Sequence, residues 1–137
     1  MPYTYEFVDE ANDCIIATWH DSHGPEEFLA FYHEILEHPK FRVGLNRLVD
    51  FRSVRINLSQ DQIEQIKIGV GPADHKHGRR KVAMLISDDN SFGVMRQYMV
   101  AVAPENVSWF LTRDAEEAVT WVGLPAGYVL PADLAKA

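Results

Sequence analysis

The sequence predicts an α/β fold, a single domain with a mainly parallel five-stranded sheet, one antiparallel edge strand and four helices, in the order ββαβαβαβα. Short apolar runs alternate with segments of helical period after an initial pair of strand-like segments. The stretch 81–102 changes from a continuous apolar run to a helical period across a polar turn. We expect the domain to span residues 1–123, followed by a tail at 124–137.

The first part of the chain contains three expected strands around one helix. Residues 3–8 alternate aromatic with polar side chains and residues 14–19 are apolar and β-branched, which predicts an antiparallel hairpin. The first helix begins at Pro25, because proline suits the first helical position, and it ends before Pro39. The apolar run 45–51 is the third expected strand.

The second helix is predicted by its first turn. Ser59 and Gln62 have the spacing of a capping box, in which each side chain bonds the backbone N–H of the other. Leu58 and Ile63 flank this box as a hydrophobic staple. Glycines and a proline at 69–72 end the helix.

The second half of the chain continues the alternation of strands and helices. A polar loop is expected at 73–80, a buried strand at 82–86 and a last strand at 106–111. The helix after the central strand has an apolar stripe at Phe92, Met95, Met99 and Val102. The last helix begins near Asp114, which has the character of a cap, and closes at Gly123.

Composition and charge exclude several classes of function. The formal net charge of −7 argues against a general role on nucleic acid or anionic membranes. No apolar run is long enough to span a bilayer, and the first residues do not form a secretory signal. The single cysteine, Cys14, lies in an apolar run, which predicts a buried, unreactive thiol in a cytoplasmic protein without disulfides.

Four stretches of the chain form a recognisable set: HPKF at 38–41, LVDFRSV at 48–54, KVAMLISDDNSFGVMRQY at 81–98 and VSWFLTRDAEEAVTWVG at 107–123. Together they resemble the SpoIIAA-like proteins, which are similar to the STAS domains of anti-sigma-factor antagonists and sulfate transporters. The resemblance extends from the second strand to Gly123. It implies the ββαβαβαβα fold and a regulatory or binding module, and many SpoIIAA-like members have no assigned activity.

The resemblance also implies a phosphorylation site at the start of the second helix. In antagonist members the modified serine follows an Asp and precedes a Gly. Ser59 stands at this place, but Leu58 precedes it and Gln60 follows it. Ser59 is therefore expected to act first as a helix cap, and as a phosphosite only second.

Polar side chains gather where the parallel strands are expected to end, which is where open α/β sheets bind ligands. The candidate ligand-binding residues are Asp50, Arg52, Asp88, Ser91, Arg96 and Arg113. The same residue types also cap helices and turns. Asp50 and Arg96 are the two principal candidates, although a pairing between them would give both a structural role.

The histidines do not predict a metal site, and no motif for a cofactor is present. His20 and His23 lie close together in sequence, as do His75 and His77, but zinc needs three or four converging ligands. The two pairs fall in loops at opposite ends of the expected strands. The basic run 75–81 is expected to be a solvated loop, with contact to an anion or acidic partner as the alternative.

Three functions stay open at this point. The first is a non-enzymatic STAS-like module that binds a partner protein or a small ligand. The second is a small enzyme that uses Asp50, Asp88 and Arg96, and the third is a carrier of an apolar, lipid-type ligand. A packed core without a pocket favours the first, and a pocket of several hundred cubic ångströms favours the others.

The two ends of the chain predict a homodimer. The first strand is rich in aromatic residues, and the tail carries the apolar residues Leu124, Tyr128, Val129 and Leu130. Such a surface is commonly buried between two copies related by a two-fold axis. The alternative is that the tail folds back over its own domain.

Overall fold

The computed structural model describes residues 2–8, 14–21, 24–102 and 106–134. Its strands are β1 (Tyr3–Val8), β2 (Cys14–Trp19), β3 (Asn46–Asp50), β4 (Arg80–Leu85) and β5 (Val107–Thr112). They form one sheet in the order β1-β2-β3-β4-β5, in which β1 is antiparallel to β2 and the other neighbours are parallel. The predicted fold class is confirmed.

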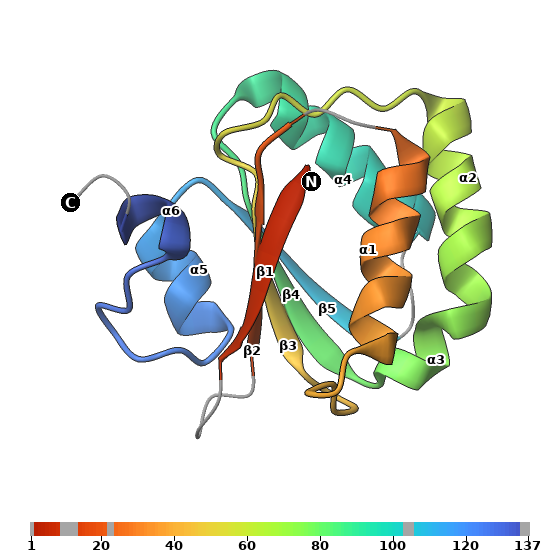
Figure 1. The fold of residues 1–137 in the computed structure, drawn as a ribbon. Helices are drawn as coiled ribbons and strands as arrows, with labels where there is room; N and C mark the ends of the chain where they lie inside the picture. Colours follow the sequence, from red (N-terminus) through yellow and green to blue (C-terminus); the bar gives the residue numbers. More distant parts are fainter. Residues whose placement is uncertain (1, 9–13, 22–23, 103–105, 135–137) are drawn as a thin grey trace.

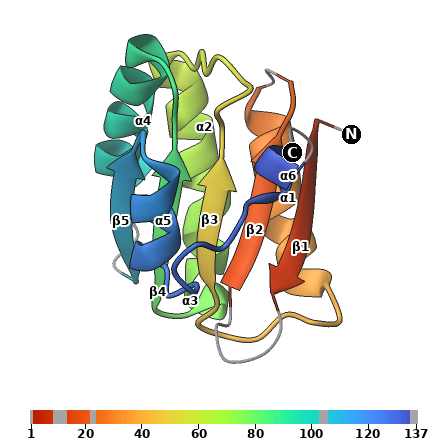
Figure 2. The same cartoon turned by 90° about the vertical axis from the view of Figure 1, so that its left-hand side faces the viewer.

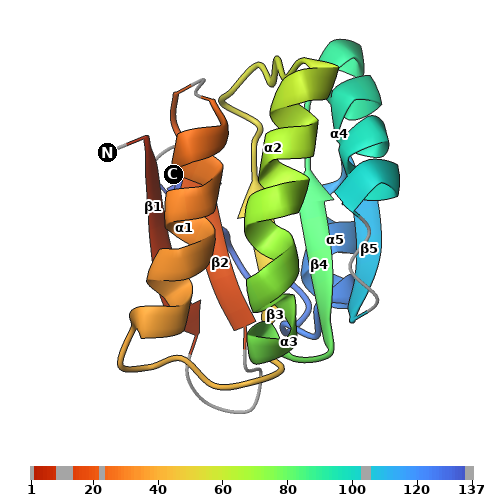
Figure 3. The ribbon, with the colours of Figure 1, turned by 90° about the vertical axis from the view of Figure 1, so that its right-hand side faces the viewer.

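Helices cover both faces of the sheet (Figure 1). They are α1 (Pro25–Glu37), α2 (Gln60–Val70), α3 (Asp74–His77), α4 (Asp89–Val102), α5 (Ala115–Trp121) and α6 (Pro131–Leu134), with a 3₁₀ turn, η1 (Gly71–Ala73), between α2 and α3. Figure 3 shows α1, α2 and α4 side by side on one face, and Figure 2 shows α5 and α6 on the other. None of the described helices is long and apolar enough to cross a membrane.

The central strands are apolar because both of their faces are covered. Every residue of β2 is buried, as are all but the first of β3 and all but one of β4. One core lies between the sheet and α1, α2 and α4, and a second lies between the sheet and α5. This double burial accounts for the continuous apolar runs of the sequence.

The tail belongs to the second core. Leu124 and Leu130 are buried in the same cluster as Leu48 of β3. The hydroxyl of Tyr128 donates to the Glu6 carboxylate across 3.4 Å. The tail therefore folds back over its own domain, and of the four apolar residues that predicted an interface only Val129 is exposed.

The structure contains two short helices that the sequence did not predict. α3 replaces part of the expected polar loop, and α6 lies in the expected tail. Each has four residues, about one turn, so neither is long enough to show a helical period in the sequence.

The buried stripe of α4 differs from the predicted one. Its buried residues are Ser91, Met95 and Tyr98, whereas Phe92 and Met99 are only half-buried. The stripe accommodates a serine because the Ser91 hydroxyl accepts a hydrogen bond from the Ile56 N–H at 2.7 Å. This rotation of the stripe directs Tyr98 into the core.

The predicted cap of α2 is confirmed. The Gln62 N–H donates to Ser59 Oγ at 3.2 Å, and the Ser59 N–H donates to Gln62 Oε1 at 2.8 Å. Leu58 and Ile63 are both buried in the first core, as the predicted staple requires. Ser59 therefore has a structural role independent of any modification.

Replacing Ser59 tests this role. We expect Ser59→Ala to lower the free energy of unfolding by about 0.5–2 kcal/mol, because an N–H at the helix start loses its acceptor. Ser59→Asp should be close to neutral, since aspartate also caps helices. Urea denaturation measures both, and equal stability of Ser59→Ala and the wild type would contradict the assignment.

The thiol of Cys14 is fully buried at the start of β2, and burial raises its pKa to about 12. We expect very slow reaction with a thiol reagent in the native protein and fast reaction in denaturant, because only the thiolate is nucleophilic. The time course of labelling with and without urea measures the difference. Rapid labelling of the native protein would show that Cys14 is accessible.

Candidate functional site

Asp50 lies at the carboxyl end of β3, buried, and pairs with Arg52. The Arg52 side chain donates from Nε to Asp50 Oδ1 at 3.0 Å and from Nη2 to Oδ2 at 2.9 Å. Arg52 Nη2 also bonds Asp133 of α6 at 3.0 Å. The suggested pairing of Asp50 with Arg96 is therefore wrong, and the Asp50–Arg52 pair instead holds the tail against the sheet.

Asp88 and Ser91 hold the start of α4. Asp88 Oδ1 accepts a hydrogen bond from the Ser91 N–H at 2.8 Å, and this bond is the main reason that the pKa of Asp88 is lowered. The Ser91 hydroxyl is turned inward to the backbone of Ile56. Asp88 thus has the capping role that was its structural alternative, whereas the Ser91 side chain links α4 to the segment before α2.

The two remaining candidates lie around Phe92. Arg113 pairs with Asp89, and its guanidinium lies 5.3 Å from the centre of the Phe92 ring. Arg96 lies 5.8 Å from the same ring centre and lines an open groove between α2 and α4. The structure does not bring Arg96 to Asp50, so the six candidates do not converge on one buried site.

The described members of the two histidine pairs lie at opposite ends of the parallel strands, as expected. His20 follows β2 and contacts Thr4 Oγ1 through Nε2 at 3.2 Å, whereas His77 precedes β4. His23 lies outside the described residues. His75 is exposed, but His77 is fully buried, so the run 75–81 is not a solvated loop throughout.

A cluster of charged side chains lies in the core at the amino ends of β3 and β4. We call it the buried basic cluster, and its members are Arg47, Asp74, His77 and Arg80, with exposed fractions of 4%, 8%, 0% and 5%. Sequence reasoning did not select Arg47 or Asp74, and it included His77 and Arg80 only in the basic run 75–81, with contact to an anion as the alternative. Charged side chains are rarely buried to this degree unless they are paired.

The alternation of side chains along β3, together with the position of α3, brings the cluster together. Arg47 alternates along β3 with Leu48, which faces the second core, so the Arg47 side chain lies on the same face as Val49 in the first core. Arg80 begins the neighbouring strand β4. The single turn of α3 then places Asp74 against Arg80 and His77 against Arg47.

Asp74 is the counter-charge of Arg80. Its Oδ1 accepts from Arg80 Nη2 at 3.0 Å and from the Tyr32 hydroxyl at 3.1 Å. Its Oδ2 accepts from Asn106 Nδ2 at 3.2 Å. Arg80 Nη1 donates to the Gly78 carbonyl at 2.9 Å. The Asp74 carboxylate therefore already accepts hydrogen bonds from Arg80, Tyr32 and Asn106.

Arg47 forms no ion pair with any carboxylate in the described part of the chain. Its Nη2 contacts His77 Nδ1, and its guanidinium lies 5.7 Å from the centre of the Tyr32 ring. Burial and, next in size, the positive charge of Arg80 lower the pKa of Arg47 to about 9, although Tyr32 and Asp74 act in the opposite direction. The cluster therefore holds two guanidinium groups and one carboxylate.

His77 cannot supply a negative charge to balance Arg47. Burial and the neighbouring Arg47 lower the pKa of His77 to about 2, so the imidazole is neutral at pH 7. A guanidinium has only donors, so Nδ1 of His77 must accept from Arg47 and its proton resides on Nε2. His77 thus presents an N–H group and no negative charge.

Four buried nitrogen atoms around the cluster lack a hydrogen-bond partner among the described residues. They are Arg47 Nε, His77 Nε2, Arg80 Nε and Trp109 Nε1. All four are N–H donors, given the proton position on His77. Buried donors without acceptors are rare and costly, so a group of them marks this part of the core as a candidate binding site for hydrogen-bond acceptors.

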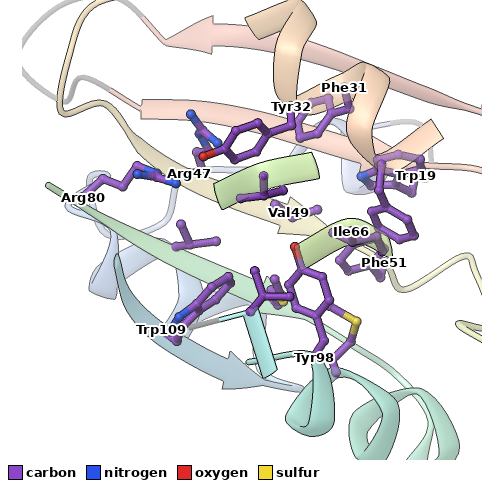
Figure 4. Close-up of a pocket in the computed structure, with 16 residues that line it drawn as sticks. Trp19, Phe31, Tyr32, Arg47, Val49, Phe51, Ile66, Arg80, Tyr98 and Trp109 are labelled. Carbon is purple, nitrogen blue, oxygen red and sulfur yellow. The ribbon is translucent and has the colours of Figure 1, made fainter. Parts of the chain in front are cut away.

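A cavity of about 60 Å³ adjoins the cluster. Figure 4 shows the guanidinium groups of Arg47 and Arg80 at one end and the rings of Trp19 and Phe51 at the other. The hydroxyl of Tyr98 points into the space between them. The cavity thus combines a cationic end with an apolar body.

No family model matches the sequence, and no curated protein matches it. The fold is similar to the crystal structure of an uncharacterized protein of the DUF3478 family with a SpoIIAA-like fold, from Shewanella loihica PV-4. The TM-score is 0.57 at 12% sequence identity, and the match covers 88% of this chain and 93% of that one. This likeness shows the fold alone, which is SpoIIAA-like, as the sequence resemblance implied.

Two arginine variants test the charge imbalance. We expect Arg47→Met to raise the free energy of unfolding by about 1–4 kcal/mol at pH 7 without ligand, because it removes a desolvated charge that lacks a counter-ion. The matched control Arg80→Met should lower it by about 3–5 kcal/mol, because Asp74 is left buried without its cation. Urea denaturation compares the two, and an equal loss for both variants would show that Arg47 is compensated in the folded chain.

Proposed function

We propose that this protein is a non-enzymatic binding module for a small organic anion with a short apolar body. The ligand lies in the cavity between the sheet and helices α1, α2 and α4. Its acidic group contacts Arg47 and the Nε of Arg80, and its apolar part lies toward Trp19 and Phe51. The observation that carries this proposal is the buried Arg47 guanidinium without a carboxylate partner.

Charge is the first support for an anionic ligand. Removing an ion from water costs several kcal/mol unless an opposite charge compensates it. Asp74 is already shared by three donors, and His77 is neutral. A bound carboxylate would neutralise Arg47 and accept from the unpartnered N–H groups of the cluster.

The cavity is the second support, because it limits the size of the ligand. Its volume of about 60 Å³ holds a group of only a few heavy atoms without movement of the walls. Typical ligand pockets occupy roughly 300–1,000 Å³. The volume therefore favours the small-ligand form of the regulatory module over a carrier for a long-chain lipid.

The position of the ligand suggests how binding in the core would affect the surface of the helices. Tyr32 belongs to α1, Arg47 to β3 and Tyr98 to α4, so one ligand contacts three elements. Compensating the cluster would stabilise the packing of these elements, since a ligand that binds only the folded state stabilises it. The affinity of a partner protein that binds these helices would then depend on the ligand.

Short-chain acids test the proposal directly. We expect butanoate to raise the thermal unfolding temperature in a concentration-dependent manner, because it binds the folded state at Arg47. Butan-1-ol, which has the same apolar body without the charge, should produce no such rise. Differential scanning fluorimetry measures the shift, and calorimetric titration measures the binding.

Two variants serve as controls. Arg47→Met should abolish the response to butanoate while remaining folded, and Arg113→Met, at an exposed arginine outside the cavity, should keep it. A series from acetate to octanoate should show an optimum at a few carbons, because of the small cavity. Equal responses of the wild type and Arg47→Met would refute the proposed site.

A further inference from the structure

β5 forms one edge of the sheet, and β1 forms the other (Figure 2). In the described part of the chain, no strand pairs with the outer side of β5. An edge strand carries a row of unpaired backbone groups that can bind another strand. Both edges of the sheet therefore have backbone groups that could pair with another strand.

The hydrogen bonds of β5 to β4 show which backbone groups face outward. The Arg80 N–H donates to the Asn106 carbonyl at 2.9 Å, and the Ile86 N–H donates to the Thr112 carbonyl at 3.0 Å. Alternate residues of a parallel strand bond to the same neighbour, so residues 106, 108, 110 and 112 face β4. The N–H and C=O groups of Val107, Trp109 and Leu111 therefore point to the open side.

The two edges differ in how they are protected. β1 contains the charged residue Glu6, which bonds Tyr128 of the tail. β5 has the sequence VSWFLT, without a charge, a lysine or a proline. Natural proteins use these residues, or a covering segment, to prevent edge strands from pairing. β5 lacks the protective residues and is suited to pairing.

The surface beside β5 has opposite charges at its two ends. An open depression lies along the strand on the side of α5, and the rings of Phe110 and Trp121 contact each other in it in a tilted arrangement, with their centres 5.3 Å apart. Glu116 lies at the start of α5, near the carboxyl end of β5. At the other end, Lys81 lies over the Trp121 ring, and its Nζ donates to the Trp121 carbonyl at 3.3 Å.

We propose that β5 pairs antiparallel with β5 of a second copy of the chain, about a two-fold axis near Trp109 and Phe110. The two sheets of five strands then join into one sheet of ten. The two α5 helices lie antiparallel, so the acidic end at Glu116 meets Lys81 of the second copy. A two-fold axis brings the acidic end of each copy next to the basic end of the other. The surface beside β5 is therefore complementary to the same surface of a second copy.

This interface differs from the one predicted from the sequence. The sequence argument placed a homodimer at the first strand and the tail, but the tail is packed on its own domain. The β5 proposal keeps the dimer and moves it to the opposite edge of the sheet. It rests on different observations from the proposed ligand, which lies under the helices of the other face, although the Trp109 side chain of β5 also lines that cavity.

Sedimentation velocity on the full chain tests the proposal. We expect a species of about 31 kDa, twice the 15.6 kDa of one chain, at micromolar concentration. Val107→Pro removes one outward N–H and should give a folded monomer, whereas the matched control Val107→Ala should remain a dimer. A monomeric wild type would leave β5 to a different partner and overturn the proposal, as would a dimer that survives Val107→Pro.

A charge exchange provides a second test that does not alter the strand. Lys81→Glu and Glu116→Lys should each raise the dimer dissociation constant several-fold, because each puts like charges opposite one another across the axis. The double variant should restore the wild-type value. Circular dichroism confirms that each variant is folded, and a double variant weaker than both single ones would overturn the arrangement.

Discussion

A guanidinium group enclosed in a protein core needs a counter-charge, and Arg47 forms no ion pair with a carboxylate of the described residues. The charge of Asp74 favours the protonated form of Arg47, but the Asp74 carboxylate is paired with Arg80. The neighbours of Arg47 are a neutral imidazole, a tyrosine ring and a second arginine whose own carboxylate is fully used. The cost of this arrangement is several kcal/mol, a large part of the stability of a small domain. A protein retains such a cost where the charge has a use, which is the reason to regard the cluster as a site.

The two faces of the sheet have different physical characters. The face covered by α5 and the tail is apolar, and the Asp50–Arg52–Asp133 ion pairs at its margin hold the tail in place. The face covered by α1, α2 and α4 contains the cavity and all four members of the buried basic cluster. The polar groups at the margin of the first of these faces are paired, whereas the other face contains the unpartnered donors on which the binding proposal rests.

Much of the fold was predictable from local patterns, because strands buried on both faces and long helices leave clear periods. The cap at Ser59 is one example, and the buried thiol of Cys14 is another. The cluster was missed for two reasons. A charge inside a doubly covered strand must be buried on either face, so Arg47 carried a signal that we did not use. Asp74 carried none, and His77 was part of the basic run 75–81, but the burial of both depends on a single helical turn without a period.

A crystal structure of the protein grown with butanoate tests the central claim most directly. The account predicts electron density for the carboxylate with an oxygen about 2.7–3.2 Å from the Arg47 guanidinium, and the hydrocarbon part toward Trp19 and Phe51. An Arg47 side chain paired with a carboxylate of the protein itself, beside an empty cavity, would contradict it.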